Sequence, residues 1–112
     1  MTLRYANRYT ERDILPFEVV DLISAGELVI REMSCDRARS WKPRMVMGHC
    51  LNESDQEWDI TSDDEALTFR IRLNKYGEWK DACGNVYQLA ENPMRFHRFS
   101  FVSGIYDADV EE

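Results

Sequence analysis

Apolar and polar residues alternate strictly in "LTFRIRL" (Leu67–Leu73), where every second side chain is apolar. This period of two is typical of a strand that turns one face toward a core. A second strand, "QEWDIT", places Trp58 and Ile60 on one face. The pattern therefore predicts strands rather than helices in the middle of the chain.

The segment "PFEVVDLISAGELVIREM" (16–33) predicts two strands joined by the loop Ser24-Ala25-Gly26. A three-residue hairpin loop of this kind needs a positive φ at its final residue, which glycine adopts without strain. The resulting register places Leu22 opposite Leu28 and Val20 opposite Ile30. Apolar residues on the other side of the ribbon predict that this hairpin is covered on both faces.

The stretch "NKYGEWKDACGN" (74–85) contains two four-residue units, each beginning with Asn or Asp and ending with Gly. This spacing predicts a type I turn followed by a left-handed glycine in each unit. The register that follows places Trp79 opposite Leu73 and Tyr87 opposite Trp79, all three on the inner face. Two chain reversals explain the stretch without a ligand.

Two segments are less regular. Residues 34–54 have no clear period, and so long a loop in a small protein is either functional or contains a short element. "RMVMGH" is the candidate for a short strand within it. In residues 93–101 the spacing of Phe99 and Phe101 fits a terminal strand, whereas Phe96 and Phe99 fit one helical turn, and the alternatives remain open.

These elements predict an all-β fold, an antiparallel meander of five to seven short strands that closes into a small Src-homology-type barrel. Closure is expected because short strands with tight connections need it, or a second layer, to bury a core. We expect residues 1–112 to form a single domain with its core at about 14–101. Residues 1–12 and 105–112 are expected to be loosely ordered.

The composition narrows the classes of function. The 112 residues carry a net charge of −7 and a pI near 4.8, which disfavours binding to nucleic acid or anionic membranes unless a local basic face overrides the average. No apolar run approaches the ~18 residues that cross a bilayer, and the N-terminal segment lacks the apolar core of an export signal. We therefore expect a cytoplasmic protein. Its three cysteines, Cys35, Cys50 and Cys83, do not form the even set of a disulfide scaffold.

An acidic region is the first candidate site. Residues 53–65 contain seven carboxylates and no base. As a strand, the segment would carry its first four acids on one face about 6.7 Å apart. The candidate partner-binding residues are Glu53, Asp55, Glu57, Asp59, Asp63, Asp64 and Glu65. The alternatives are an ordinary solvated strand face, or short helices starting at the capping-box patterns Ser54-x-x-Glu57 and Ser62-x-x-Glu65.

A basic and aromatic surface is the second candidate. Arginine beside an exposed aromatic ring can hold single-stranded nucleic acid by phosphate pairing and base stacking. The alternative is that these cations simply pair with neighbouring acids. The candidate residues are Arg37, Arg39, Trp41, Lys42, Arg44, Arg70, Arg72 and Lys80.

Metal and catalytic signatures are absent from the sequence. The acidic run lacks the glycine that an EF-hand loop has at its sixth position, and no close Cys pair begins a zinc site. No hydrolase, zinc-protease or phosphate-loop motif occurs. A Cys50–His97 or Cys83–His49 dyad stays open, because such partners meet only in space. We expect no enzyme activity, no cofactor and no bound metal.

The order "RYTERDILPFEVVDLIS", "LVIRE", "GHCLN", "QEWDIT" and "RIRLNKYGEWKDACGNVYQL" resembles a family of small uncharacterised proteins encoded in bacteriophage and prophage genomes. The resemblance spans about residues 8–101, and its motifs are structural. It implies a bacterial cytoplasmic setting and a phage accessory role. It transfers no catalytic or binding residue.

Together these observations favour a non-enzymatic accessory module that binds a protein partner, and modulates a host factor, through the acidic face. The alternative is a small barrel that binds nucleic acid through the basic and aromatic residues. The partner's identity, the oligomeric state and the order of residues 34–54 are left open by the sequence.

Overall fold

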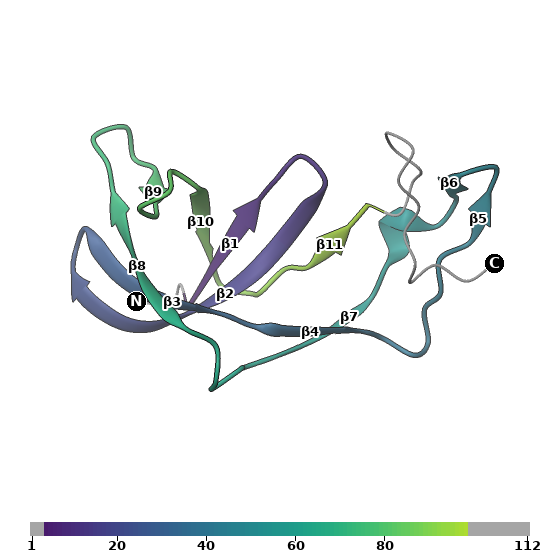
Figure 1. Ribbon diagram of the computed structural model, residues 1–112, viewed down its shortest axis with the longest axis horizontal. Coiled ribbons are helices and arrows are strands. Elements are labelled where there is room, and N and C mark those ends of the chain that lie inside the picture. The colour runs from purple at the N-terminus through teal and green to yellow at the C-terminus, as the bar shows by residue number, and fades with distance from the viewer. Residues whose placement is uncertain (1–3, 99–112) are drawn as a thin grey trace.

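The computed structural model describes residues 4–98, which form strands and one short 3₁₀ helix (Figure 1). The strands are β1 (Tyr5–Tyr9), β2 (Asp13–Ser24), β3 (Glu27–Glu32), β4 (Ser34–Arg37), β5 (Met45–Val46), β6 (His49–Cys50), β7 (Trp58–Thr61), β8 (Thr68–Leu73), β9 (Trp79–Lys80), β10 (Val86–Ala90) and β11 (Phe96–His97). The 3₁₀ helix η1 spans Glu53–Asp55. None of the described segments is a helix long and apolar enough to span a membrane.

Six antiparallel strands close into a barrel in the order β1-β10-β9-β8-β3-β2, and β1 then pairs with β2. Around the barrel the strands follow chain order, β1, β2, β3, β8, β9 and β10, so the barrel is a meander with one insertion. β11 adds a seventh strand to the free part of β2. The predicted small all-β barrel is confirmed.

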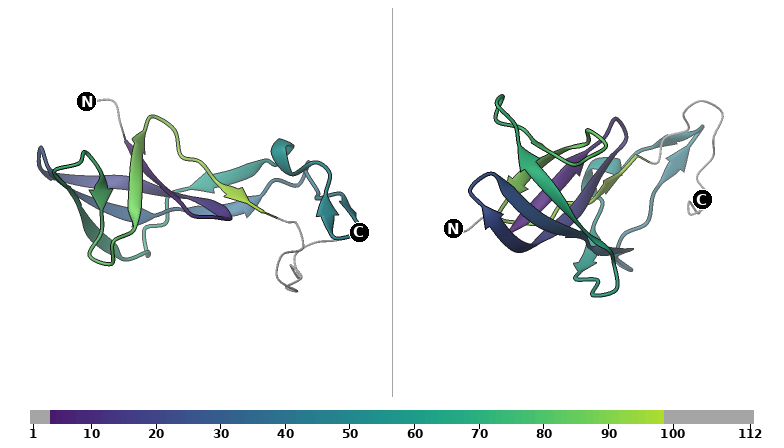
Figure 2. Two further views of the ribbon diagram at one scale, coloured as in Figure 1. Left: turned by 90° about the horizontal axis from the view of Figure 1, so that it is seen from above. Right: turned by 60° about the vertical axis from the view of Figure 1, so that its left-hand side comes forward.

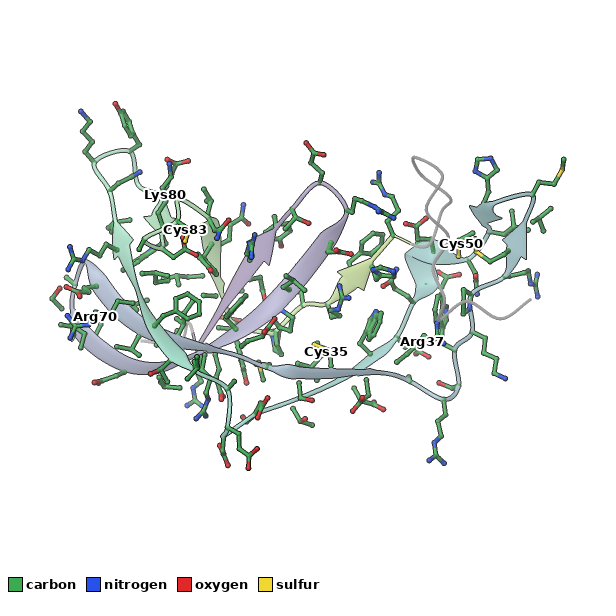
Figure 3. All side chains as sticks on the ribbon, in the orientation of Figure 1. Cys35, Arg37, Cys50, Arg70, Lys80 and Cys83 are labelled. Atoms are coloured by element: carbon green, nitrogen blue, oxygen red, sulfur yellow. The ribbon has the colours of Figure 1, made fainter. Side chains whose placement is uncertain are left out.

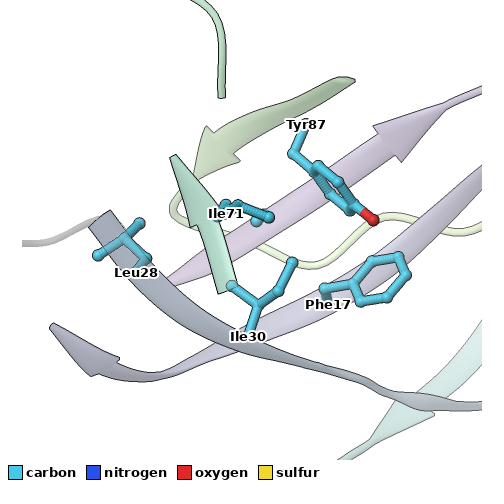
Figure 4. Packing of buried hydrophobic residues seen from close by; sticks show 6 residues of the cluster. Phe17, Leu28, Ile30, Ile71 and Tyr87 are labelled. Carbon is cyan, nitrogen blue, oxygen red and sulfur yellow. The ribbon is translucent and has the colours of Figure 1, made fainter. Parts of the chain in front are cut away.

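The core lies inside this barrel (Figure 4). Its aromatic centre is Phe17, whose ring packs edge-on against Tyr87 at 5.2 Å and against Phe69 at 5.6 Å between centroids. Edge-to-face pairs of this kind add to the gain from burying the rings. The buried apolar residues of the cluster are Ala6, Phe17, Leu28, Ile30, Ile71 and Tyr87.

Both glycine-terminated turns form as predicted. Leu73 lies opposite Trp79, and Trp79 lies opposite Tyr87. Gly77 and Gly84 have φ values of 81° and 89°, which side chains rarely adopt. One part of the prediction is wrong, because Leu73 is 42% exposed. It lies at the rim, beyond the reach of the core.

The strand over 67–73 is confirmed except at its first residue. Phe69 and Ile71 face the core, but Leu67 precedes β8 and is 87% exposed. It belongs to the loop 62–67, which joins β7 to β8. The alternating pattern therefore begins one residue before the paired strand does.

The β2–β3 hairpin differs from the prediction in two respects. Its loop is Ala25-Gly26, and Gly26 does not adopt the left-handed conformation. Leu22 does lie opposite Leu28, but a bulge between Val19 and Asp21 places Val19, and not Val20, opposite Ile30. A bulge inserts one residue on one strand only, which an alternating pattern does not reveal.

The end of this hairpin is covered on one face only. Val20, Leu22 and Ile23 are between 39% and 57% exposed. The prediction of two covered faces is wrong here because a closed barrel has a single interior, and no second layer of the described residues lies outside β2.

Residues 5–9 were expected to be loosely ordered, with the core starting near residue 14. Instead they form β1, and Ala6 and Asn7 are almost completely buried. The buried Asn7 amide donates to the Asn92 carbonyl at 3.1 Å and accepts from the Met94 amide at 3.0 Å. The pattern of apolar residues did not predict this strand, because its buried side chains are those of Ala6 and Asn7, neither of them large and apolar.

Asn7 thereby directs the chain from β10 into β11. Phe96 and His97 pair with Ile14 and Asp13 of β2, so this part of residues 93–101 is a strand and not a helix. Phe99 and Phe101, like residues 105–112, lie outside the described residues.

Residues 34–61 form an arm that extends the molecule to 48 × 27 × 23 Å (Figure 2). β3 leads almost directly into β4, which pairs with β7, and the arm ends in the short β5–β6 hairpin. The stretch 34–54, predicted to be an irregular loop or to hide a short element, thus contains β4, β5 and β6. "RMVMGH" supplies β5, the turn and the first residue of β6.

Asp81 holds the second turn to the core. Its carboxylate accepts from the backbone amides of Cys83 and Asn85, from the Asn85 side chain, and from the Tyr87 hydroxyl at 2.8 Å. Partial burial acts to raise the pKa of Asp81, but the hydrogen bonds from Asn85 and Tyr87 outweigh it and lower this pKa. Burial and the bond to Asp81 raise the pKa of Tyr87.

We expect Asp81→Ala to lower the free energy of unfolding by about 1–3 kcal/mol, because it leaves the buried Tyr87 hydroxyl without its acceptor. Folding lowers the pKa of Asp81. Its contribution to the free energy of unfolding is therefore fully present above about pH 4 and is lost as the pH falls through the lowered pKa. Denaturant titrations across this range measure both effects. The exposed Glu91→Ala is the control. Identical unfolding midpoints and pH profiles for Asp81→Ala and the native chain would contradict the assignment.

Candidate functional site

The arm carries the most uneven charge distribution in the chain. Residues 37–52 contain four Arg and Lys and no carboxylate, whereas residues 53–65 contain seven carboxylates and no base. Both segments belong to the arm or to the loop at its base. The acidic segment and the 37–44 part of the predicted basic surface therefore both lie on the arm or at its base.

The predicted row of four acids on one strand is wrong. Glu53 and Asp55 lie in η1, and β7 begins only at Trp58. Gln56 explains the interruption, because its side chain bonds to the Glu53 carbonyl and to both backbone groups of His97. The chain must turn at this point to deliver Gln56 to β11, so a continuous strand cannot reach back to residue 53.

Neither of the two capping-box patterns begins an α-helix. Ser54 lies inside η1 instead of capping a helix, and Ser62 donates to Glu18 at 2.8 Å. After Ser62 the backbone makes a turn in which Asp63 accepts from the Glu65 amide at 3.1 Å. Both short helices are therefore ruled out.

A different acidic pair occupies the outer face of the arm. The register of β4 with β7 places Asp36 directly opposite Asp59, and both side chains are exposed. Neither forms an ion pair with any residue in 4–98. Like charges directly opposite on a ribbon destabilise it. Sequence reasoning missed Asp36 because nothing in the pattern pairs residue 36 with residue 59.

The remaining predicted acids flank this pair. Glu57 is exposed and accepts from the Ser40 hydroxyl at 3.1 Å, while Glu53 is largely covered and lies 3.8 Å from Arg98. At the base of the arm, Asp64 is 91% exposed and lies 3.3 Å from Arg31. Thus the acids form an outer face and a basal loop, not a single row.

Arg31 anchors the basal loop to the barrel. Its guanidinium also lies 2.6 Å from Glu18, whose other oxygen accepts from Ser62. The hydrogen bond that the Arg31 guanidinium donates to Glu18 is the main reason that the pKa of Arg31 is raised. The basal acids are therefore positioned from β2 and β3 and do not depend on the arm alone.

The inner side of the arm is attached to β11. Gln56 accepts from the His97 amide at 2.8 Å and from the Trp58 indole at 2.6 Å. Arg95 lies over the Trp58 ring at 4.8 Å, and His97 bonds Asp13 at 2.9 Å. These contacts link the arm to the barrel through side chains, and they fix which face of β7 points to solvent.

The basic residues do not form one surface. Figure 3 shows Arg70 and Lys80 on the barrel and Arg37 far away on the arm. Trp41 is only 6% exposed, so its ring is not open to base stacking. The single basic and aromatic face is therefore wrong, because the arm separates the Arg37–Arg44 segment from the outer face of β8 and β9.

Each basic group nevertheless borders a shallow cavity. Arg70, Arg72 and Lys80 line one of about 410 Å³ on the barrel. Two others, of about 220 and 450 Å³, lie around Trp41 at the end of the arm. On the barrel, Arg70 and Arg72 are 3.0 and 3.7 Å from the same Glu27 oxygen, so these cations are partly neutralised.

The cysteines do not assemble into a reactive group. Figure 3 shows Cys83 on the barrel and Cys50 at the end of the arm, so His49, adjacent to Cys50, cannot meet Cys83. Burial raises the pKa of the Cys35 thiol, although Arg95 partly offsets this, and a raised pKa disfavours the thiolate. Within residues 4–98 no three His, Cys, Asp or Glu side chains are grouped to hold a metal ion.

Comparisons with known proteins add no relative. No protein-family model, no curated protein and no solved structure matches the chain.

The attachment of the arm leads to a direct test. We expect Gln56→Leu to expose the His97 amide and to speed its hydrogen exchange roughly tenfold or more. The substitution removes both hydrogen bonds between the Gln56 side chain and the His97 backbone, and it removes the acceptor of the Trp58 indole. Amides of Ile30 and Ile71 in the barrel should keep their protection. Gln88→Leu, at an exposed glutamine of β10, is the matched control. Unchanged exchange at His97 would show that Gln56 does not hold the arm.

Proposed function

We propose that the protein is a non-enzymatic accessory module that binds a protein partner through the acidic outer face of its arm. The observation that carries the proposal is the pair Asp36 and Asp59, directly opposite each other and exposed. Their repulsion lowers the stability of the two-stranded β4–β7 ribbon, which is attached to β11 on its inner side. A partner's Lys or Arg placed between the two carboxylates would relieve that repulsion.

Further acidic residues extend this face along the arm and onto the loop at its base. Glu57 follows on the same arm, and Asp63, Asp64 and Glu65 lie in the loop at its base. A partner with a basic surface would contact the ribbon and the loop together. Such complementarity raises the association rate and excludes acidic competitors, and its effect falls with added salt.

The non-enzymatic part of the proposal is supported by how the cysteines are placed. Cys83 lies on the barrel and Cys50 at the end of the arm, and burial disfavours the thiolate of Cys35. The resemblance to phage-encoded proteins supports a bacterial cytoplasmic setting, in which the partner is a host factor that the protein modulates.

The double substitution Asp36→Asn/Asp59→Asn separates binding from folding. We expect it to raise the free energy of unfolding by about 0.2–1 kcal/mol, because the opposed charges are removed. Capture of the partner from bacterial lysate should fall at least tenfold at low salt. Denaturant titration measures the first effect and quantitative affinity capture measures the second.

Glu11→Gln/Glu91→Gln provides the matched control, because it removes two exposed charges from the barrel and none from the arm. It should leave capture unchanged. If both double variants retain the partner equally, the acidic face is not its binding site.

Nucleic-acid binding is the second candidate, favoured by the cavity that Arg70, Arg72 and Lys80 share on the barrel. The cations could hold phosphates there, although Glu27 competes for two of them. The net charge of −7 repels nucleic acid at long range and so disfavours this function.

Gel-shift titrations with single-stranded and duplex probes test this second candidate. A real site would give binding that weakens steeply with salt, and Arg70→Gln/Arg72→Gln would weaken it further. Arg39→Gln/Arg44→Gln changes the same charge on the arm and serves as the control. No shift of either probe at low salt would eliminate this function.

A further inference from the structure

The end of the arm presents an apolar side chain in an unfavourable position. Met47 is 94% exposed and has a φ of 51°, and it is followed by Gly48 with a φ of 80°. Positive φ at both central residues is the requirement of a type I′ turn, whose first position favours Asn or Asp. Met47 therefore serves neither the turn nor a core among residues 4–98.

The hairpin that carries Met47 also bears one cationic and two further apolar side chains. Alternation along β5 and β6 places Val46 and Leu51, which are 48% and 63% exposed, on the same face as Arg44. Arg44 is exposed and forms no ion pair with residues 4–98. We call this group, Arg44, Val46, Met47 and Leu51, the tip.

The base of the arm has the opposite character. Leu67 is 87% exposed, and among the described large apolar residues only Met47 is more exposed. It ends the loop that carries Asp63, Asp64 and Glu65. We call these four residues the base.

The tip and the base are complementary in both respects. Each presents one highly exposed apolar side chain, and the charges around the two are opposite. Docking Met47 against Leu67 would cover both apolar groups and would bring Arg44 to the carboxylates.

We propose that the tip of one copy of this chain docks on the base of a second copy. The proposal goes beyond the proposed function, because it assigns the basal acids to a second copy of the chain and not to the partner of the outer face. Figure 1 shows the β5–β6 hairpin and the β7–β8 loop at opposite ends of the arm. The contact is therefore head-to-tail, and it extends into longer assemblies instead of closing at a dimer.

Two single substitutions at exposed positions test the contact. Met47→Asp blocks the tip and Leu67→Asp blocks the base, and Asp at position 47 also suits the turn. By sedimentation velocity, the native chain should show a mean mass that rises with concentration between about 10 µM and 1 mM and falls with added salt. Each variant alone should be monomeric.

An equimolar mixture of the two variants should form dimers and nothing larger. The intact tip of Leu67→Asp can dock on the intact base of Met47→Asp, and the two blocked surfaces repel each other. Tyr76→Asp, at an apolar side chain that is 75% exposed on a barrel turn, is the control and should assemble like the native chain.

A native chain that is monomeric across this range would overturn self-association, as would a mixture that remains monomeric. Either result leaves the capture experiment with Asp36→Asn/Asp59→Asn unaffected, because that experiment reports on a different protein from the lysate. Conversely, normal assembly together with undiminished capture by Asp36→Asn/Asp59→Asn would reject the acidic outer face and retain the tip-to-base contact.

Discussion

Closure of the barrel by β1 is the interaction on which the rest of the structure depends. β1 pairs with β2 on one side and β10 on the other, and no other described strand could join these two edges. Its buried Asn7 then holds residues 92–94, which lead into β11. β11 in turn receives Gln56 and, through Arg95, the Trp58 ring of the arm. The orientation of the arm, and hence of every candidate binding residue on it, follows from a strand at the opposite end of the sequence.

The arm itself is unusual in how little it contributes to the core. Its two strands β4 and β7 form a separate two-stranded ribbon, and such a ribbon is marginal unless it packs against something else. Attachment to β11 supplies that support on the inner face. The outer face is left to acidic side chains that repel each other, and the far end to cations and exposed apolar groups. A fold selected for stability alone has no need of this arrangement, and this is why we propose that the arm binds a partner.

The candidate site was predicted from sequence in its composition but not in its geometry. The acidic run and the basic segment are both visible in the chain, and most of their charged side chains are exposed. The predicted row of four acids does not form, because the Gln56 side chain makes hydrogen bonds to the His97 backbone in β11 and the chain bends before β7 begins. Asp36 went unnoticed because cross-strand neighbours separated by more than twenty residues leave no local pattern. Trp41 was assigned to a stacking surface, yet the fold of the arm buries it.

Features set by neighbouring residues could be read from the sequence alone. The Asx residues and glycines at 74–77 and 81–84 determined two turns, and with them the register of β8, β9 and β10, because hydrogen bonds within four residues and a positive φ leave few other conformations. The period of two determined that the chain forms strands. The bulge in β2, the role of Asn7, the burial of Trp41 and the pairing of Asp36 with Asp59 emerged only once distant segments were packed together. Their energies come from contacts between residues far apart in the chain, and local pattern carries no information about which distant partner a side chain will meet.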